Sequence, residues 1–310
     1  MYKILISTSS FDLANIPELC ALESAGFEFI LNPYARRLSE NEISTLLEDN
    51  VVGLIAGVEP LTSNVLHSAQ LLKVIARCGI GMDSVDVSAA QELGIRLSNT
   101  PDAPTLPVAE LTLAHMLNLL RSVSRADRGV RNNEWKALMG SLLSEKTVGI
   151  IGFGRIGRKV AELVQAFGAK VLAYDVLPIQ SIGNVTEVDL NTLLCESDLI
   201  SLHLPYCEST HHLISANQIE LMKSSAFLFN ISRGGLVDET ALYDALAAQR
   251  LAGAGLDAFE NEPYTGPLKE LENVLITTHM GSYAREARIK MEQEAARNLV
   301  ADLRKLGLYN

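Results

Sequence analysis

The sequence is poor in the features that mark disulfide scaffolds, metal centres and nucleic-acid surfaces. It has only four cysteines, Cys20, Cys78, Cys195 and Cys207, in 310 residues, and their spacing is not that of metal ligands. We therefore expect reduced, mostly buried thiols and no metal site. Lysine and arginine number 26 against 37 aspartates and glutamates, which gives a net charge of −11 without any basic run. This balance argues against a nucleic-acid partner.

Long hydrophobic runs and a signal-peptide pattern are missing as well. No uninterrupted apolar stretch reaches the roughly 20 residues that a membrane helix needs. The chain begins Met1-Tyr-Lys-Ile-Leu-Ile-Ser7, which leads directly into an apolar strand pattern. The sequence therefore predicts a cytoplasmic protein that does not bind a membrane.

What the sequence does contain is a regular alternation of short apolar runs with amphipathic segments. At 310 residues the chain is longer than the roughly 250–300 residues at which single cores stop growing, so two domains are expected. Alternation of strand and helix patterns predicts parallel sheets with helices on both faces, and hence an α/β fold. We expect one domain to consist of residues 1–98 and 283–310, and the other of residues 99–282.

The expected elements follow from apolar periodicity. Strands are predicted at residues 3–7, 27–31, 53–56, 73–76 and 95–97, and then at 148–151, 170–174, 199–204, 226–231, 253–258 and 274–278. One long helix is predicted over residues 107–131, and its period suits a bridge between domains, a subunit interface or a plain core helix equally well. Within it, His115 is expected to be a packed or surface residue rather than a ligand.

The most informative stretch is residues 146–157, where an apolar run ends at Gly152 and continues through Gly154 and Gly157 into a helical pattern. A strand, a tight turn and a helix N-terminus of this kind present N–H groups and the helix dipole to a pyrophosphate, and a Cβ would block the approach. Asp175 ends the next apolar run, where a carboxylate accepts hydrogen bonds from an adenosine ribose. Because its charge would repel a 2′-phosphate, NAD is predicted as the cofactor rather than NADP.

Further motifs follow in order over nearly the whole chain. They are Asp175 after the glycine motif, His203-Leu204-Pro205, Asn230-Ile231-Ser-Arg233-Gly-Gly, Gly255-Leu-Asp257-Ala-Phe, Asn261-Glu262-Pro263 and Thr278-His279-Met-Gly281-Ser282. Together with the glycine motif, they resemble the D-isomer-specific 2-hydroxyacid dehydrogenases. The resemblance implies two doubly wound parallel-sheet domains, a flavodoxin-like substrate domain and a Rossmann NAD-binding domain. It also implies an NAD-dependent oxidoreductase that acts on CH–OH groups.

Hydride transfer to a 2-keto acid needs a cation for the substrate carboxylate and an acid/base that works near neutral pH. Arg233 offers a planar fork that matches a carboxylate, and His279 titrates near physiological pH. Glu262 is the candidate partner that would fix the tautomer of His279. The resemblance gives the matching arginine, glutamate and histidine these catalytic roles.

The resemblance also implies the remaining binding residues. For the cofactor these are the backbone N–H groups of Arg155 and Ile156, the three motif glycines, Asp175, the turn His203-Leu204-Pro205, Thr210, Ile231, Asp257, His279 and Gly281. Asp257 is expected to hydrogen-bond the nicotinamide amide. For the substrate they are Ile80 and Gly81, whose amides would bind the carboxylate, together with Arg233.

Within the family, the resemblance is greatest to phosphoglycerate dehydrogenases, which act in serine biosynthesis, and to hydroxypyruvate or glyoxylate reductases. We expect 3-phosphoglycerate and phosphohydroxypyruvate as the first choice of substrate, and hydroxypyruvate or glyoxylate as the alternative. Two departures bear on this choice. Glu59 stands near the place of an Arg-Ser pair that many phosphoglycerate dehydrogenases have, where it would repel a phosphate, and Thr278 replaces the proline that often precedes the catalytic histidine.

Two expectations concern partners and mode of action. The resemblance implies a homodimer built on the helix at residues 107–131. An alternative from another class is an NADH-sensing binding protein of the same fold, similar to transcriptional corepressors that keep the catalytic residues. Tight NADH binding without turnover of any 2-keto acid would favour that alternative.

Overall fold

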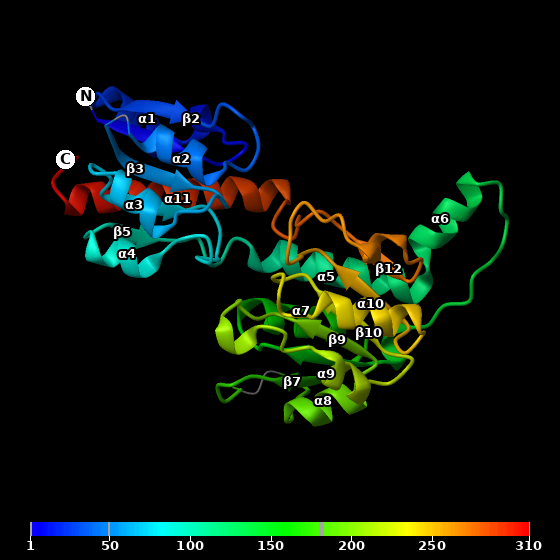
Figure 1. Cartoon of the computed structure of the whole chain (residues 1–310). Coiled ribbons are helices and arrows are strands. Elements are labelled where there is room, and N and C mark those ends of the chain that lie inside the picture. The colour runs from blue at the N-terminus through cyan, green and yellow to red at the C-terminus, as the bar shows by residue number, and fades with distance from the viewer. Residues whose placement is uncertain (1, 49, 180–182, 310) are drawn as a thin grey trace. The chain divides into compact units, whose positions relative to one another are not determined.

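The computed structural model describes residues 2–48, 50–179 and 183–309 (Figure 1). The chain divides into two compact units. Unit 1 consists of residues 1–104 and 282–310, and unit 2 of residues 105–281. Unit 2 is thus inserted into the chain of unit 1. The sequence predicts the boundaries at 98/99 and 282/283.

Unit 1 is a parallel sheet of five strands in the order β2-β1-β3-β4-β5, which is the flavodoxin-like order. The strands are β1 (Lys3–Ile6), β2 (Glu28–Leu31), β3 (Val51–Ala56), β4 (Val74–Arg77) and β5 (Arg96–Ser98). The helices are α1 (Pro17–Ser24), α2 (Glu40–Leu47), α3 (Ser63–Ser68), α4 (Val87–Glu92) and α11 (Arg285–Lys305). Side chains of Ser39, Thr62 and Asp86 accept backbone hydrogen bonds at the starts of α2, α3 and α4, which explains where these helices begin.

Alternate side chains of the strands build two cores in unit 1. Ile4 and Ile6 of β1 pack with α1 and α11 on one face, whereas Leu5 packs with α2 and α3 on the other. Figure 1 shows α11, drawn in red, running beside the strands of this unit. The approach is close, because a Cβ at Gly53 of β3 would lie 2.9 Å from Leu299 of α11. The C-terminal helix is therefore an integral part of the unit 1 core.

Unit 2 is a parallel sheet of seven strands in the order β12-β11-β10-β9-β6-β7-β8. Counted from β6, this is the Rossmann order, extended by one strand. The strands are β6 (Thr147–Ile151), β7 (Lys170–Tyr174), β8 (Val185–Glu187), β9 (Leu199–Leu202), β10 (Phe227–Asn230), β11 (Gly253–Leu256) and β12 (Val274–Ile276). The flanking helices are α7 (Arg155–Ala166), α8 (Leu190–Glu196), α9 (Ala216–Leu221) and α10 (Glu239–Ala247). The predicted α/β class with two doubly wound parallel sheets is confirmed.

The prediction of a single helix over residues 107–131 is wrong. The segment forms α5 (Thr105–Arg121) and α6 (Val123–Arg131), which are separated by Ser122 in the left-handed conformation with a φ of +52°. Asn118 stabilises the break, because its Oδ1 accepts from Ser124 N at 3.0 Å. Apolar periodicity continues across such a break and therefore does not reveal it.

The thiols also differ from the expectation. All four cysteines are free, but Cys20, Cys195 and Cys207 are exposed and only Cys78 is buried. Cys20 of α1 and Cys195 of α8 are not among the buried residues of their helices, and Cys207 lies in an exposed turn, so the general tendency of free cysteine to be buried does not decide these positions.

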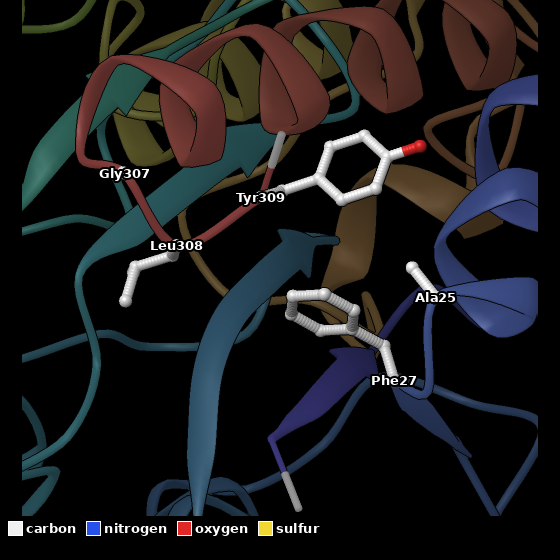
Figure 2. Close-up of a pocket in the computed structure, with 5 residues that line it drawn as sticks. All are labelled: Ala25, Phe27, Gly307, Leu308 and Tyr309. Atoms are coloured by element: carbon white, nitrogen blue, oxygen red, sulfur yellow. The ribbon is translucent and has the colours of Figure 1, made fainter.

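A hollow of about 350 Å³ lies at the C-terminal end of unit 1. Figure 2 shows the residues that line it, Ala25, Phe27, Gly307, Leu308 and Tyr309. The rings of Phe27 and Tyr309 stand edge to face, with centroids 6.2 Å apart. This hollow contains none of the residues to which the sequence assigns chemistry. Among the helices that the structure describes, none is long and apolar enough to cross a membrane.

Candidate active site

The loop between β6 and α7 has a backbone shape that suits a pyrophosphate. Gly152 has a φ of +92°, and a Cβ there would lie 2.5 Å from the carbonyl oxygen of His203. A Cβ at Gly157 would lie 2.1 Å from the Gly152 oxygen, so this glycine lets α7 pack on the loop. Gly154 differs, because a Cβ built there meets nothing within 4 Å. Space is therefore open in front of the N-terminus of α7.

Asp175 lies at the C-terminal end of β7, beside this loop. Its Oδ2 accepts from Phe153 N at 2.7 Å, and its Oδ1 accepts from Leu177 N at 3.0 Å. Arg155 and Ile156 form the first turn of α7, where N–H groups lack partners within the helix. An open helix N-terminus next to a carboxylate on the neighbouring parallel strand fits the pyrophosphate and ribose of a dinucleotide.

The turn after β9 borders the same loop. The Nε2 atom of His203 lies 2.9 Å from Ser201 Oγ, and burial lowers the pKa of His203 to about 3, so its ring is neutral at pH 7. Thr210 Oγ1 donates to Pro205 O at 3.0 Å. The turn from Pro205 to Thr210, which follows Leu204, is thereby closed. Since β6 and β9 flank the point where the strand order reverses, these residues occupy the usual ligand position of an open α/β sheet.

His279 and Glu262 form a hydrogen-bonded pair in the segments that follow β12 and β11. The Nδ1 atom of His279 lies 2.8 Å from Glu262 Oε1 and 2.9 Å from Oε2. Phe259 N also donates to Oε1, at 3.1 Å. Because a carboxylate only accepts, the proton of the neutral imidazole lies on Nδ1. Nε2 is then the atom that can exchange a proton with a substrate.

Arg233 follows β10 in a tight loop. Asn230 Nδ2 donates to Arg233 O at 2.7 Å, which anchors the loop to the end of the strand. A Cβ at Gly234 would lie 2.0 Å from Phe259 O, so only glycine permits this contact. Phe259 in turn binds the carboxylate of Glu262 through its backbone N–H. The structure therefore brings together the loops of all three predicted catalytic residues in unit 2.

Asp257 is buried and hydrogen-bonded within unit 2. Its Oδ1 accepts from Thr277 Oγ1 at 2.5 Å and from Met280 N at 2.9 Å, and its Oδ2 accepts from Gly281 N at 2.8 Å. A Cβ at Gly281 would lie 3.6 Å from Ile231, so these predicted cofactor residues are neighbours. Contact between Asp257 and the nicotinamide stays a prediction, whereas its hold on the His279 loop is a property of the structure.

The predicted substrate loop of unit 1 follows β4. Asn99 Nδ2 donates to Ile80 O at 2.8 Å, and Gly79 N donates to Thr100 Oγ1 at 2.8 Å. Gly79 has a φ of +145°, which an L side chain rarely adopts. Hydrogen bonds to residues 99 and 100 thus fix the backbone that leads to Gly81.

Glu59 is part of the interior of unit 1. Its side chain is 1% exposed, Ser7 Oγ donates to its Oε1, and Gly57 N donates to the same atom at 3.1 Å. Burial raises the pKa of Glu59. The expected repulsion between its charge and a substrate phosphate is therefore not supported.

The sequence did not single out Thr277, and it predicted His115 only as a packed or surface residue; the structure buries His115. They lie 3.1 Å apart, between His115 Nε2 and Thr277 Oγ1, although 162 positions separate them. The only sequence hint is Gly255 within a strand pattern, because a Cβ there would lie 2.9 Å from His115 Nδ1. Among the residues that the structure describes, no group of three or more His, Cys, Asp and Glu could hold a metal ion.

Comparison with known proteins places this site in a family. Residues 113–281 match the model of the D-isomer specific 2-hydroxyacid dehydrogenase, NAD binding domain. The chain belongs to the D-isomer-specific 2-hydroxyacid dehydrogenase family. It is an NAD-dependent 2-hydroxyacid dehydrogenase, an oxidoreductase acting on CH–OH groups, as the sequence motifs predicted.

Individual relatives include a hydroxypyruvate reductase, glyoxylate reductases and D-3-phosphoglycerate dehydrogenases. The chain is 38% identical over 275 residues to a hydroxypyruvate reductase of Thermotoga maritima, covering 87% of this chain and 90% of that protein. It is 40% identical over 275 residues to a D-3-phosphoglycerate dehydrogenase of Methanocaldococcus jannaschii, covering 86% of this chain but only 52% of that protein. Among solved structures, the TT0316 protein of Thermus thermophilus has a TM-score of 0.89 at 36% identity, covering 98% of this chain and 97% of that one.

Proposed function

We propose that the substrate pair of this dehydrogenase is 3-phosphoglycerate and phosphohydroxypyruvate. The identity of 40% to a D-3-phosphoglycerate dehydrogenase is consistent with this choice but does not distinguish it from glyoxylate reduction, because a glyoxylate reductase is also 40% identical. The burial of Glu59 supports a phosphorylated substrate, because this is the acidic residue that was expected to repel a phosphate and its carboxyl group is hydrogen-bonded inside unit 1. The observation that carries the reaction itself is the His279–Glu262 pair next to the Arg233 loop.

In the proposed mechanism Arg233 binds the substrate carboxylate through its planar guanidinium. His279 gives its Nε2 proton to the carbonyl oxygen in the reducing direction, and it accepts the hydroxyl proton in the oxidising direction. Glu262 holds the proton of His279 on Nδ1 and stabilises the imidazolium. The bound NAD(H) supplies the hydride donor or acceptor.

The proposed cofactor contacts follow from the open end of the sheet in unit 2. The N–H groups of Arg155 and Ile156 bind the pyrophosphate, and Gly154 allows it to approach. Asp175 binds the adenosine ribose, and the turn from His203 to Thr210 borders the cofactor. In unit 1, the amides of Ile80 and Gly81 are proposed to bind the substrate carboxylate.

One observation favours hydroxypyruvate or glyoxylate as a second candidate. Arg77, the cation next to the predicted substrate loop, is 8% exposed. Its Nη1 donates to the carbonyl oxygens of Cys78 and Ala56. This guanidinium is thus engaged by the chain's own backbone, so a substrate phosphate would need another cation.

A substrate panel distinguishes the candidates. We expect NADH oxidation with phosphohydroxypyruvate to have a kcat/KM at least about 10-fold above that with hydroxypyruvate, glyoxylate or pyruvate, since a bound phosphate contributes charge-assisted hydrogen bonds. A preference for an unphosphorylated acid would transfer the proposal to the second candidate. Absence of turnover with all four acids, despite NADH binding, would contradict both.

We further propose a homodimer built on α5, α6 and the segment after them. Every residue of α6 is at least partly exposed, and Trp135 and Met139 are 91% and 96% exposed. Large apolar side chains gathered on one segment mark an interaction surface. Figure 1 shows α6 and the following segment, in green, extending from the sheet of unit 2.

The dimer can be tested through Trp135, which is the only tryptophan in the sequence. Burial at a subunit interface would shift its fluorescence emission to shorter wavelength, and dilution below the dissociation constant would reverse the shift. We expect a light-scattering mass of two chains for the wild type and of one chain for a Trp135→Asp, Met139→Asp double variant. A wild-type mass of one chain at micromolar concentration would exclude the proposed dimer.

A further inference from the structure

His115 is a buried residue of α5 that the mechanism above does not use. Its side chain is 1% exposed, and it belongs to a chain of hydrogen bonds that joins three separate elements. Its Nε2 lies 3.1 Å from the hydroxyl of Thr277, just after β12, and that hydroxyl lies 2.5 Å from Oδ1 of Asp257, just after β11. A helix that carries no predicted catalytic residue is thereby connected to the two strands that lead into the site.

The direction of these hydrogen bonds follows from the chemistry of the groups. The carboxylate of Asp257 only accepts, so the single hydroxyl proton of Thr277 points to Asp257. The hydroxyl oxygen must therefore accept from His115, which requires the tautomer with the proton on Nε2. Burial lowers the pKa of His115 to about 4, so this neutral form is the one present at pH 7.

The other ring nitrogen of His115 lies against the backbone of β11. Among the residues that the structure describes, none provides a hydrogen-bond partner for Nδ1. A Cβ at Gly255 would lie 2.9 Å from this atom, so the glycine makes room for the ring. The ring is thus held in one orientation, with Nε2 as its only bonded nitrogen.

The end of this chain of hydrogen bonds is the loop that carries His279. His279 has a φ of +52°, a left-handed conformation that is unfavourable for a residue with a Cβ. The next two amides, of Met280 and Gly281, donate to the two oxygens of Asp257 at 2.9 and 2.8 Å. The Asp257 carboxylate thus holds the backbone directly after the strained residue His279.

We propose that His115 is a positioning residue that acts through Thr277 and Asp257 to hold the His279 loop in its strained, active conformation. The inference rests on the proposed function of His279 as the acid/base. Without the Nε2–H donor, Thr277 can rotate its hydroxyl away and Asp257 loses its fixed orientation. His279 then spends less time at the distance of 2.8 Å from Glu262 that fixes its tautomer.

The test compares His115→Gln with His115→Leu. Glutamine carries an N–H donor that can reach Thr277, whereas leucine fills a similar space without one. We expect His115→Leu to lower kcat about 10-fold, and His115→Gln to stay within about 3-fold of the wild type. Equal loss in both variants would indicate packing alone and overturn the proposal, as would full activity in His115→Leu.

Thr277→Val provides a second route into the same network, because valine keeps the shape of threonine but lacks the hydroxyl. We expect this variant to lose as much kcat as His115→Leu, and the double variant to lose little more than either single one. Losses that multiply in the double variant would contradict a shared path. Thermal unfolding of each variant verifies that the comparison is made on folded protein.

A structural readout separates this proposal from the proposed function. The imidazole Cε1–H resonance of His279, assigned with His279→Asn, should shift in His115→Leu and return in His115→Gln. This readout needs no turnover, so it tests the positioning even if wild-type protein were to reduce none of the keto acids. An unchanged His279 resonance in His115→Leu would refute the positioning role and leave the proposed function intact.

Discussion

Replacing Glu262 by glutamine removes the charge next to His279 while it keeps the shape of the side chain. The two carboxylate oxygens lie 2.8 and 2.9 Å from Nδ1, and the side chains of His279 and Glu262 are 42% and 30% exposed. Solvent screening at this exposure reduces the attraction between carboxylate and imidazolium to about 0.2–1 kcal/mol. We therefore expect protonated His279 to be destabilised by about this amount in Glu262→Gln.

This loss has a defined sign in the two reaction directions. Reduction of a keto acid begins with protonated His279, and oxidation ends with it. A penalty of about 1 kcal/mol corresponds to about 5-fold in rate. The rates of both directions at pH 7 should therefore fall by up to about 5-fold.

The assay follows NADH absorbance in both directions between pH 5 and 10, with Glu260→Gln as the matched control. Glu260 lies in the same segment, but its Oε1 pairs with His212 Nε2 at 2.7 Å. The control substitution removes an equal charge without touching His279. The reasoning is refuted if Glu262→Gln keeps the wild-type rates, or if Glu260→Gln lowers the rates by the same factor.

Three further predictions follow from the geometry of unit 2. Gly154→Ala should cost less than about 1 kcal/mol of stability in urea unfolding yet weaken NADH binding measured by fluorescence. Gly157→Ala should cost about 1–3 kcal/mol of stability, because its Cβ would lie 2.1 Å from Gly152 O. Wild-type NADH affinity in Gly154→Ala would count against the pyrophosphate site. Asp175→Ser should raise the kcat/KM ratio of NADPH to NADH about 10-fold or more, and an unchanged ratio would show that the carboxylate does not face the ribose. Burial lowers the pKa of His115 to about 4 from 6.5, so as the pH falls the unfolded chain binds a proton at a higher pH than the folded chain does. The free energy of unfolding should therefore fall by about 2 kcal/mol between pH 7 and pH 5. Urea titrations of His115→Gln should lack that loss.

Much of the fold is local in origin, which is why the sequence predicts it. Both β6 and β7 are apolar runs bounded by polar residues, and two of the motif glycines after β6, Gly152 and Gly157, are required by close backbone contacts. The strand β8 (Val185–Glu187) was not predicted, because it is short and its residues are mixed in polarity and largely exposed. The break at Ser122 was missed because it depends on one left-handed residue and on the side chain of Asn118, neither of which changes the apolar period.

The site was predictable only as far as its motifs reach. The loops of Arg233, Glu262 and His279 each follow a strand, and parallel strands bring their carboxyl ends to one edge. The orientation of a side chain in such a loop is set by distant partners. Glu59 turns inward because Ser7 and Gly57 bind it, and His115 meets Thr277 across the unit 2 core. Sequence periodicity contains no information about such contacts.

The central claim is that Arg233 and His279 perform substrate binding and proton transfer in an NAD-dependent 2-hydroxyacid dehydrogenase. Its most direct test measures NADH binding and keto-acid turnover side by side in the wild type, Arg233→Ala and His279→Ala. We predict that Arg233→Ala binds NADH with an affinity similar to that of the wild type, and that each variant loses turnover by at least about 100-fold, since general acid–base catalysis alone contributes about 10²–10⁴-fold. Turnover within about 10-fold of the wild type in either variant would contradict the account.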